Sequence, residues 1–235
     1  MHHLVVERWS RGSSPLHARD ARAKIAALAT FLIAVSTTPP SAQPAFAAYG
    51  VLLLAAIVAA RLPIGSVMRR AALVLPFSAT FALFTWWGGD STHALALAEK
   101  SFLSGLAALI AIATTPLADL VQGLESFFVP RFLLLVIQFV YRYLFVISEQ
   151  AQHMRLAALS RQGRGRAGYR FRAAAGAVGV LFARSWERAE GIHHAMLARG
   201  FSGRIPSLDH PHFHAADVLF FIVVASASVG IRLTL

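Results

Sequence analysis

Long apolar runs separated by short basic segments limit the fold of this chain more than any other feature. Of its 235 residues, 57% are hydrophobic and 14% are charged, whereas a soluble domain has about 25% charged residues. Four or five of the runs approach the roughly 20 residues that cross a bilayer. We therefore predict an integral membrane protein with spanning helices over 22–38, 44–60, 71–88, 97–114 and 215–235.

The positive charge follows the apolar runs. The formal charge of +11 comes almost wholly from arginine, and the arginines lie between apolar runs and in the block 155–204. In a soluble protein this charge would indicate nucleic acid binding. In a membrane protein it indicates segments that stay in the cytoplasm, so we expect no nucleic acid partner. The absence of cysteine excludes disulfides and cysteine-liganded metals.

The first apolar run has a second reading, as a signal peptide. Its apolar core follows basic residues and precedes small residues, as in a secretory signal. The leader before the core is more than twenty residues long and contains Glu7 and Asp20, which favours a first spanning helix instead.

The run 131–148 is apolar enough to cross the membrane, but charge argues against it. With a cytoplasmic N-terminus, four spans return the chain to the cytoplasm near residue 115. A crossing at 131–148 would then place the arginine-rich block 155–204 outside, against the positive-inside rule. We predict that 131–162 is one long helix on the cytoplasmic side, which gives five spans. A six-span arrangement in which 116–130 crosses as part of a broken helix is the alternative.

Two further helices complete the expected cytoplasmic region. The stretch 116–130 lies between prolines and carries apolar residues at helical spacing opposite Asp119 and Glu125, which indicates an interfacial amphipathic helix. A second long helix is expected over 170–199. The predicted fold is therefore all-α, with about five transmembrane helices, an interfacial amphipathic helix and two long cytoplasmic helices.

Both long helices end on an arginine. "ALSRQG" places Arg161 two residues before Gly163, and "AMLARGFSG" places Arg199 directly before Gly200. A single such ending is explained by an arginine beside the helix dipole and a glycine C-cap. The repetition, with the small residues Ser160 and Ala198 before each arginine, favours two docking tips. A helix of about 30 residues would hold them roughly 45 Å apart.

These motifs resemble the transmembrane T component of energy-coupling factor (ECF) transporters. "TTPLADLVQGL", "VYRYLFVISEQ" and "LFARSWERAEGIHHAM" resemble its CbiQ branch, the cobalt and nickel importers. The resemblance is clear over 100–205 and extends to the first four spans only as a pattern. "ARG" at 198–200 matches the family signature, whereas "SRQ" at 160–162 keeps only the arginine.

The resemblance implies a non-catalytic coupling subunit in the bacterial cytoplasmic membrane, with its N-terminus in the cytoplasm and no cofactor. Its partners would be two cytoplasmic ATPase subunits and a substrate-binding membrane subunit of the CbiM/NikM type. The residues expected to dock the ATPases are Ser160, Arg161, Gln162, Ala198, Arg199 and Gly200. The residues expected to contact the substrate-binding subunit are Leu120, Leu124, Phe127, Phe128, Leu135 and Phe139.

The implied organisation follows the sides of the membrane. It comprises a cytoplasmic segment 1–21, four spans over 22–115, a coupling-helix region over 116–205, and a linker with the last span over 206–235.

The sequence leaves one alternative within this class of transporter and argues against two other functions. A T component for a vitamin would share all these features. A self-contained secondary transporter would need buried ionisable residues and an internal repeat, and neither is evident. An intramembrane hydrolase would need a paired nucleophile and base, for which Ser101, Ser104 and His93 are too scattered. No phosphate-binding loop or HExxH motif is present.

The histidines suggest metal binding less strongly than their number implies. "HPHFH" places histidines at 210, 212 and 214, and "MHH" opens the chain with His2 and His3. The amino terminus and the imidazoles of "MHH" could chelate Ni²⁺ or Cu²⁺, and "HPHFH" could bind a transported metal. An ordinary loop and chain end explain them better, and in the family that the chain resembles a separate membrane subunit selects the metal. No metal site is therefore predicted in this chain.

Overall fold

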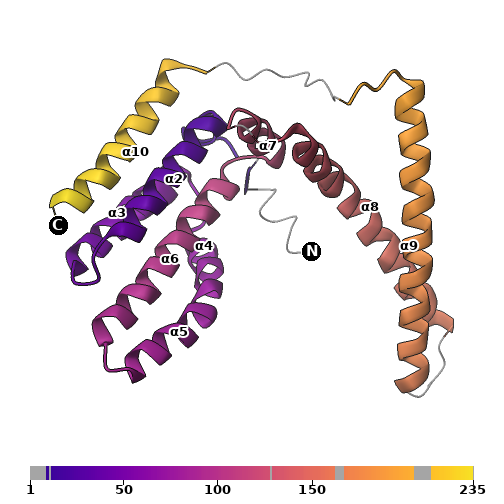
Figure 1. Cartoon of the computed structure of the whole chain (residues 1–235), viewed down its shortest axis with the longest axis horizontal. Helices are drawn as coiled ribbons and strands as arrows, with labels where there is room; N and C mark the ends of the chain where they lie inside the picture. Colours follow the sequence, from indigo (N-terminus) through magenta and orange to yellow (C-terminus); the bar gives the residue numbers. More distant parts are fainter. Residues whose placement is uncertain (1–8, 11, 128, 162–166, 204–212, 235) are drawn as a thin grey trace. The chain divides into compact units, whose positions relative to one another are not determined.

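A computed structural model describes residues 9, 10, 12–127, 129–161, 167–203 and 213–234. Within these residues the regular elements are all helices (Figure 1). The chain divides into two compact units. Unit 1 comprises Met1–Phe128 and Pro211–Leu235, and unit 2 comprises Val129–His210.

The helices of unit 2 are long, with 31 and 32 residues, whereas unit 1 combines long helices with short helices of eight and nine residues. Those of unit 1 are α2 (Ala21–Thr37), α3 (Gln43–Ala59), α4 (Ile64–Ala71), the 3₁₀ turn η1 (Ala72–Val74), α5 (Leu75–Trp87), α6 (Ser91–Ala113), α7 (Leu117–Glu125) and α10 (Ala215–Thr234). Those of unit 2 are α8 (Arg131–Arg161) and α9 (Ala167–Ala198). The predicted all-α fold with about five apolar spanning helices is confirmed.

Two predicted spans begin earlier than hydropathy indicates. The third was expected at 71 after a basic linker, but α4, η1 and α5 form a continuous stretch over Ile64–Trp87 that contains Arg69 and Arg70. Arg70 lies over the ring of Trp9 at 4.7 Å, a cation–π contact within unit 1. The fourth begins at Ser91 and not at 97, because the Asp90 side chain caps the helix by accepting a hydrogen bond from the backbone of His93.

Length and apolar composition allow four stretches of the described residues to cross a membrane: Ile64–Trp87, Ser91–Ala113, Phe132–Ser160 and Ala215–Thr234. The helix α3 is apolar but shorter. With 17 residues each, α2 and α3 are about 26 Å long, close to the lower limit for a span. The stretch within α8 is the one that the charge argument assigns to the cytoplasmic side.

The first and last helices of unit 1 run parallel to each other. At their starts, the backbone N–H of Asp20 donates to Oδ1 of Asp217 at 3.1 Å. At their ends, Nε of Arg232 donates to Oγ1 of Thr37 at 2.7 Å. Parallel helices align their dipoles unfavourably, and an acid at the starts and a base at the ends offset that repulsion. Figure 1 shows α10 (yellow) alongside α2 (indigo).

The helix α6 runs antiparallel to α2 and is fixed by two lysines. Nζ of Lys24, near the start of α2, donates to the carbonyl of Thr114 after the end of α6 at 2.9 Å. Nζ of Lys100 on α6 donates to the carbonyl of Ser36 at the end of α2, also at 2.9 Å. Each lysine supplies a donor and a positive charge at a helix C-terminus, where carbonyls have no partner within the helix.

The core of unit 1 lies between α2, α3, α4 and α6. Tyr49 and Ile57 of α3 are fully buried in it, and Phe31 of α2 packs edge-on against Tyr49 with the ring centroids 5.5 Å apart. The Tyr49 hydroxyl donates to the carbonyl of Ser228 on α10 at 3.3 Å. This buried hydrogen bond satisfies the polar end of an otherwise apolar side chain.

The short helix α7 packs against the start of α2. A Cβ at Gly123 would lie 3.0 Å from Cδ1 of Ile25 and 3.2 Å from Cβ of Ala21. The glycine therefore permits a close approach of the two helices. At nine residues, α7 is about 14 Å long and too short to cross a bilayer.

Candidate functional site

The helix α9 ends in a Schellman motif. The N–H of Gly200 donates to the carbonyl of Leu197 at 2.9 Å, and the N–H of Phe201 donates to the carbonyl of Met196 at 3.0 Å. Gly200 has a φ of +77°, the left-handed conformation that this motif requires. The capping explanation of Gly200 is thus correct for the backbone, and Arg199 is the last residue before the turn.

The Arg199 side chain is exposed at this tip, as is Ala198. The capping hydrogen bonds use only backbone atoms, so they leave the guanidinium available. A guanidinium presents several N–H donors in a planar fork, which fits a carboxylate or adjacent carbonyl oxygens. The small Ala198 leaves space beside the arginine for a partner surface.

The end of α8 is described only in part. Ser160 is exposed, and its hydroxyl donates to the carbonyl of Leu156 at 3.1 Å. Arg161 is the last helical residue. Its side chain, and the whole of Gln162, lie outside the residues whose placement is described.

Unit 2 places the two arginines at opposite ends of α9. The helix begins six residues after Arg161 and ends one residue before Arg199. With 32 residues it is about 48 Å long. Helices α8 and α9 contact each other. The lengths of both helices agree with the sequence prediction of two widely separated tips.

The residues expected to contact a substrate-binding subunit fall in both units. In unit 1, Leu120 and Leu124 of α7 are half-buried, Phe127 is exposed, and Phe128 lies outside the described residues. In unit 2, Leu135 and Phe139 of α8 are half-buried. The two groups therefore belong to different units, and their contact with a substrate-binding subunit stays a prediction.

Aromatic pairs line α8, a feature that the sequence analysis did not identify. The rings of Phe139 and Tyr143 stack at 6.2 Å, and those of Tyr141 and Phe145 meet edge-on at 5.3 Å. The sequence could have shown these pairs, because aromatic residues four positions apart lie on one face of a helix. Arg142 lies 6.0 Å from the Tyr143 ring.

A polar junction at the helix starts of unit 1 was also missed. We use this name for the cluster of Arg19, Asp20, Lys24, Thr114 and Asp217. Asp217 is nearly fully buried, accepts the backbone N–H of Asp20, and lies 3.7 Å from Nη1 of Arg19. The sequence signal was an acid just before the first apolar run and another at the start of the last run.

Asp217 also belongs to the capping of its own helix. Its Oδ2 accepts the backbone N–H of His214 at 3.0 Å, the hydrogen bond that the third residue of a capping box makes. His210 and His212 of the "HPHFH" motif lie outside the described residues. Among the described residues, no group of three or more His, Cys, Asp and Glu side chains could hold a metal ion.

Comparison with known proteins places these features in a family. The family model of CbiQ, described as a cobalt transport protein, matches residues 12–210. An uncharacterized protein of Methanocaldococcus jannaschii is 28% identical over 56% of this chain and 53% of its own length. The cobalt transport protein CbiQ of Rhodobacter capsulatus is 29% identical over 49% of this chain and 48% of its own length.

A third relative covers more of the chain. The energy-coupling factor transporter transmembrane protein EcfT of Bacillus selenitireducens is 25% identical over 85% of this chain and 84% of its own length. The chain spans only about half the length of the first two relatives. The family model, by contrast, covers well over half of the chain and includes both arginine tips. The chain is a multi-pass membrane protein and belongs to the CbiQ family of cobalt transport proteins.

Proposed function

We propose that this chain is the transmembrane coupling subunit of an ECF-type importer. It would transmit the motion of two cytoplasmic ATPases to a substrate-binding membrane subunit. The matching family and the Rhodobacter capsulatus relative are both named as cobalt transport proteins, which favours cobalt or nickel as cargo. The EcfT relative names an energy-coupling factor transporter without a substrate, so a vitamin is the alternative cargo.

One observation carries this proposal: two long helices end in arginines at opposite ends of unit 2. Docking on two separate ATPase subunits requires two separated contact points on a stiff element. The roughly 48 Å length of α9 supplies the separation. The exposed Arg199 supplies a donor fork at one end, and we assign Arg161 the same role at the other.

The geometry of unit 1 supports a cytoplasmic position for this region. Helices α2 and α10 are parallel, so both start at the same end of unit 1. Helix α7, which leads toward unit 2, packs against the start of α2. The chain therefore leaves unit 1 and returns to it at one end, and 129–210 makes either no crossing or an even number of crossings.

We take the number of crossings by 129–210 to be zero. A crossing by α8 would need a second one by α9, and α9 is not among the stretches apolar enough to span. We then assign five spans, to α4–α5, α6 and α10 and to the shorter helices α2 and α3, whose 17 residues lie at the lower limit for a span. The arginine-rich block then lies on the side of the N-terminus, which the positive-inside rule assigns to the cytoplasm.

In this arrangement the residues of the chain hold and transmit force and perform no chemistry. Arg161 and Arg199 would serve as the joints with the ATPases. The apolar faces that contain Leu124, Leu135 and Phe139 would hold the substrate-binding subunit. ATP hydrolysis would remain with the partner subunits, and metal selection with the substrate-binding subunit.

The test is ATP-dependent uptake of radioactive cobalt or nickel by the assembled complex, with wild type compared to Arg161→Ala and Arg199→Ala. A charge-assisted hydrogen bond is worth about 1.5–3 kcal/mol, so each variant should weaken ATPase retention on co-purification roughly tenfold or more. The double variant should abolish uptake. Arg188→Ala, an exposed arginine in the middle of α9, is the matched control and should behave as wild type.

Full uptake by the double variant would contradict the docking roles. If the variants lose uptake but keep their ATPases, the arginines transmit motion without contributing to affinity. Uptake of a vitamin but not of metal by the wild-type complex would keep the coupling function and exclude the metal cargo.

A further inference from the structure

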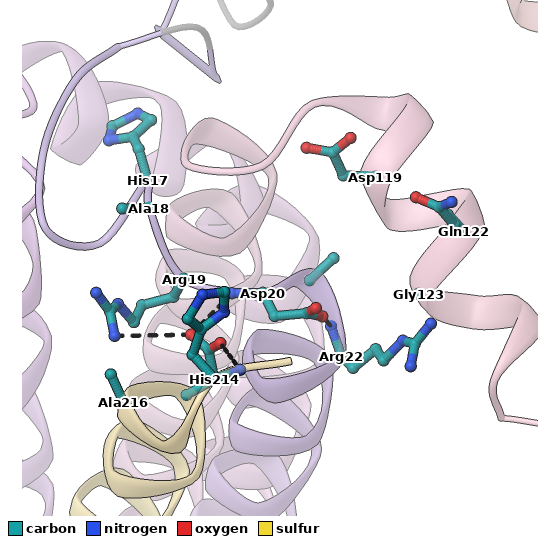
Figure 2. A pocket seen from close by; sticks show the side chains of 12 residues that line it. His17, Ala18, Arg19, Asp20, Arg22, Asp119, Gln122, Gly123, His214 and Ala216 are labelled. Carbon is teal, nitrogen blue, oxygen red and sulfur yellow. Dashed lines mark hydrogen bonds and ion pairs between the residues drawn. The ribbon is translucent and has the colours of Figure 1, made fainter. Parts of the chain in front are cut away.

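A polar pocket of about 440 Å³ lies at the helix starts of unit 1, between α2, α7 and α10. Figure 2 shows its lining, with Asp119 projecting from α7 and Arg22 extending from α2 toward α7. The residues of the pocket that matter here are Arg19, Asp20, Arg22, Asp119, Gln122 and Asp217. The proposed function makes no use of this pocket.

Asp20 shows that one acceptor in the pocket wall lacks a donor. The residue is 9% exposed, and its Oδ1 accepts the backbone N–H of Arg22 at 2.7 Å as the cap of α2. Its Oδ2 is buried and has no hydrogen-bond partner in the described structure. A buried carboxylate oxygen without a donor is costly. An ammonium group, which carries several N–H donors and a positive charge, would supply the missing partner.

The guanidinium of Arg22, two residues after Asp20, lacks an acceptor among the described residues. Its side chain is half-buried in the pocket wall, and no described residue forms a hydrogen bond or ion pair with its guanidinium. The other arginine of the wall, Arg19, already faces Asp217 at 3.7 Å. A phosphate would match this guanidinium fork.

The position of the pocket indicates that these two groups belong to a lipid. It lies at the ends of the membrane-spanning helices, and an apolar pocket of about 100 Å³ begins one turn further along them. Lys24 and Ala27 of this second pocket follow Asp20 on one face of α2, and Phe220 and Val224 follow Asp217 on one face of α10. A polar site above an apolar one matches a headgroup followed by an acyl chain.

We propose that this pocket binds a phospholipid with a primary-amine headgroup, of the phosphatidylethanolamine type. Asp20 receives the ammonium group, Arg22 receives the phosphate, and an acyl chain lies toward the apolar pocket. The bound lipid fills the space between the starts of α2, α7 and α10. This site goes beyond the proposed function, because it requires neither the ATPases nor a substrate-binding subunit.

The test is native mass spectrometry of the full chain, delipidated in mild detergent and titrated with lipids of identical acyl chains. Phosphatidylethanolamine should bind about tenfold more tightly than phosphatidylcholine, because methylation removes every N–H donor from the headgroup. Arg22→Gln should weaken both lipids about tenfold, and Arg22→Lys should recover part of the loss. Asp20→Asn, which keeps the capping oxygen of α2, should remove the preference between the two lipids.

Arg69→Gln is the control for charge alone, because Arg69 is exposed on α4 and does not line the pocket. It should leave binding of both lipids unchanged. Equal binding of the two lipids by wild type, or no effect of Arg22→Gln, would overturn the proposal. Free phosphoethanolamine that competes as well as the intact lipid would assign the site to a soluble ligand. Because binding is measured on the chain alone, failed coupling would leave these results unaffected.

Discussion

The two units of this protein are held together in different ways. In unit 1, side chains connect helices that are far apart in sequence, such as Asp217 to the start of α2 and Lys100 to its end. In unit 2, side-chain hydrogen bonds and ion pairs such as those between Ser185 and Leu181 or between His153 and Glu149 join residues of one helix.

Their apolar side chains differ in the same way. Unit 1 has a buried core around Tyr49 and Ile57. Large apolar residues of α9, including Phe171, Phe182 and Trp186, are more than 60% exposed. Exposed apolar surface of this extent is typical of interaction sites. Unit 1 also exposes large apolar residues, such as Phe77 and Trp87, but they lie on a stretch apolar enough to cross a membrane, where lipid would cover them. The helix α9 is not among such stretches. The difference indicates that unit 1 is stable through its own contacts and that unit 2 has surfaces for partners.

One pair of identical substitutions tests this contrast most strongly. Phe46 in unit 1 is 4% exposed, and Phe182 in unit 2 is 70% exposed. Phe46→Ala should lower the free energy of unfolding by about 3–5 kcal/mol, because it leaves a cavity in the core. Phe182→Ala should change it by less than about 0.5 kcal/mol. Titration of the purified chain with SDS in mixed micelles measures both values.

In the assembled complex, the same two variants should affect different properties. Phe182→Ala should reduce co-purification of partner subunits, whereas Phe46→Ala should reduce the amount of folded chain. A large stability loss for Phe182→Ala would show that unit 2 has a core of its own and would end the distinction between the units.

Asp217 tests the long-range polar contacts of unit 1. Asp217→Ala would leave the N–H groups of Asp20 and His214 without their acceptor and the Arg19 guanidinium without its counter-charge. The expected loss is about 3 kcal/mol, since removing one partner of a buried ion pair leaves the other uncompensated. Asp217→Asn keeps an amide oxygen and should lose about half as much. Equal losses in the two variants would mean that the charge contributes little.

The sequence predicted the helices of unit 1 better than the contacts between them. Apolar length and charge placed the spans, because both are local properties of the chain. The parallel pairing of α2 and α10 depends on Asp20 and Asp217, which are 197 residues apart. No local pattern relates those two residues. The helical position of Arg69 and Arg70 was missed because hydropathy assigns basic residues to linkers.

The sequence predicted the candidate docking site at Arg199 but not the polar pocket. The tip at Arg199 could be found because a helix end, a glycine and a small residue form a local signature, and its backbone is a Schellman motif as that signature implies. The polar pocket could not be found, since Asp20, Asp119 and Asp217 approach one another only after three helices have packed.

Gly200 tests whether the tip of unit 2 depends on its backbone as well as on its arginine. Gly200→Ala places a Cβ on a residue with a φ of +77° and should cost about 1 kcal/mol. It should also change the direction of Arg199 and reduce uptake. The matched control is Gly191→Ala in the middle of α9, where nothing lies within 4 Å of the added Cβ. That variant should stabilise the helix by up to about 1 kcal/mol.

Unchanged uptake in Gly200→Ala would show that the guanidinium alone positions the partner. Reduced uptake in Gly191→Ala would show that α9 must bend, which conflicts with its role as a stiff element. Hydrogen exchange of the last turn of α9 distinguishes local fraying from loss of the whole helix.

The smallest effect is expected at the exposed turn of unit 1, where Asp90 caps α6 through local contacts alone. The backbone N–H of His93 at 3.0 Å, followed by the Thr92 hydroxyl at 2.9 Å, holds the pKa of the Asp90 carboxyl below its ordinary value. Its contribution is therefore complete above the ordinary pKa of aspartate and is lost as the pH falls through the lowered value. The melting temperatures of wild type and Asp90→Asn should differ slightly near pH 6 and converge as the pH falls below the lowered pKa. A difference in melting temperature that persists in acid would mean that Asp90 contributes without its charge. A loss of stability as large as that of Asp217→Asn would show that exposed local caps matter as much as buried long-range contacts.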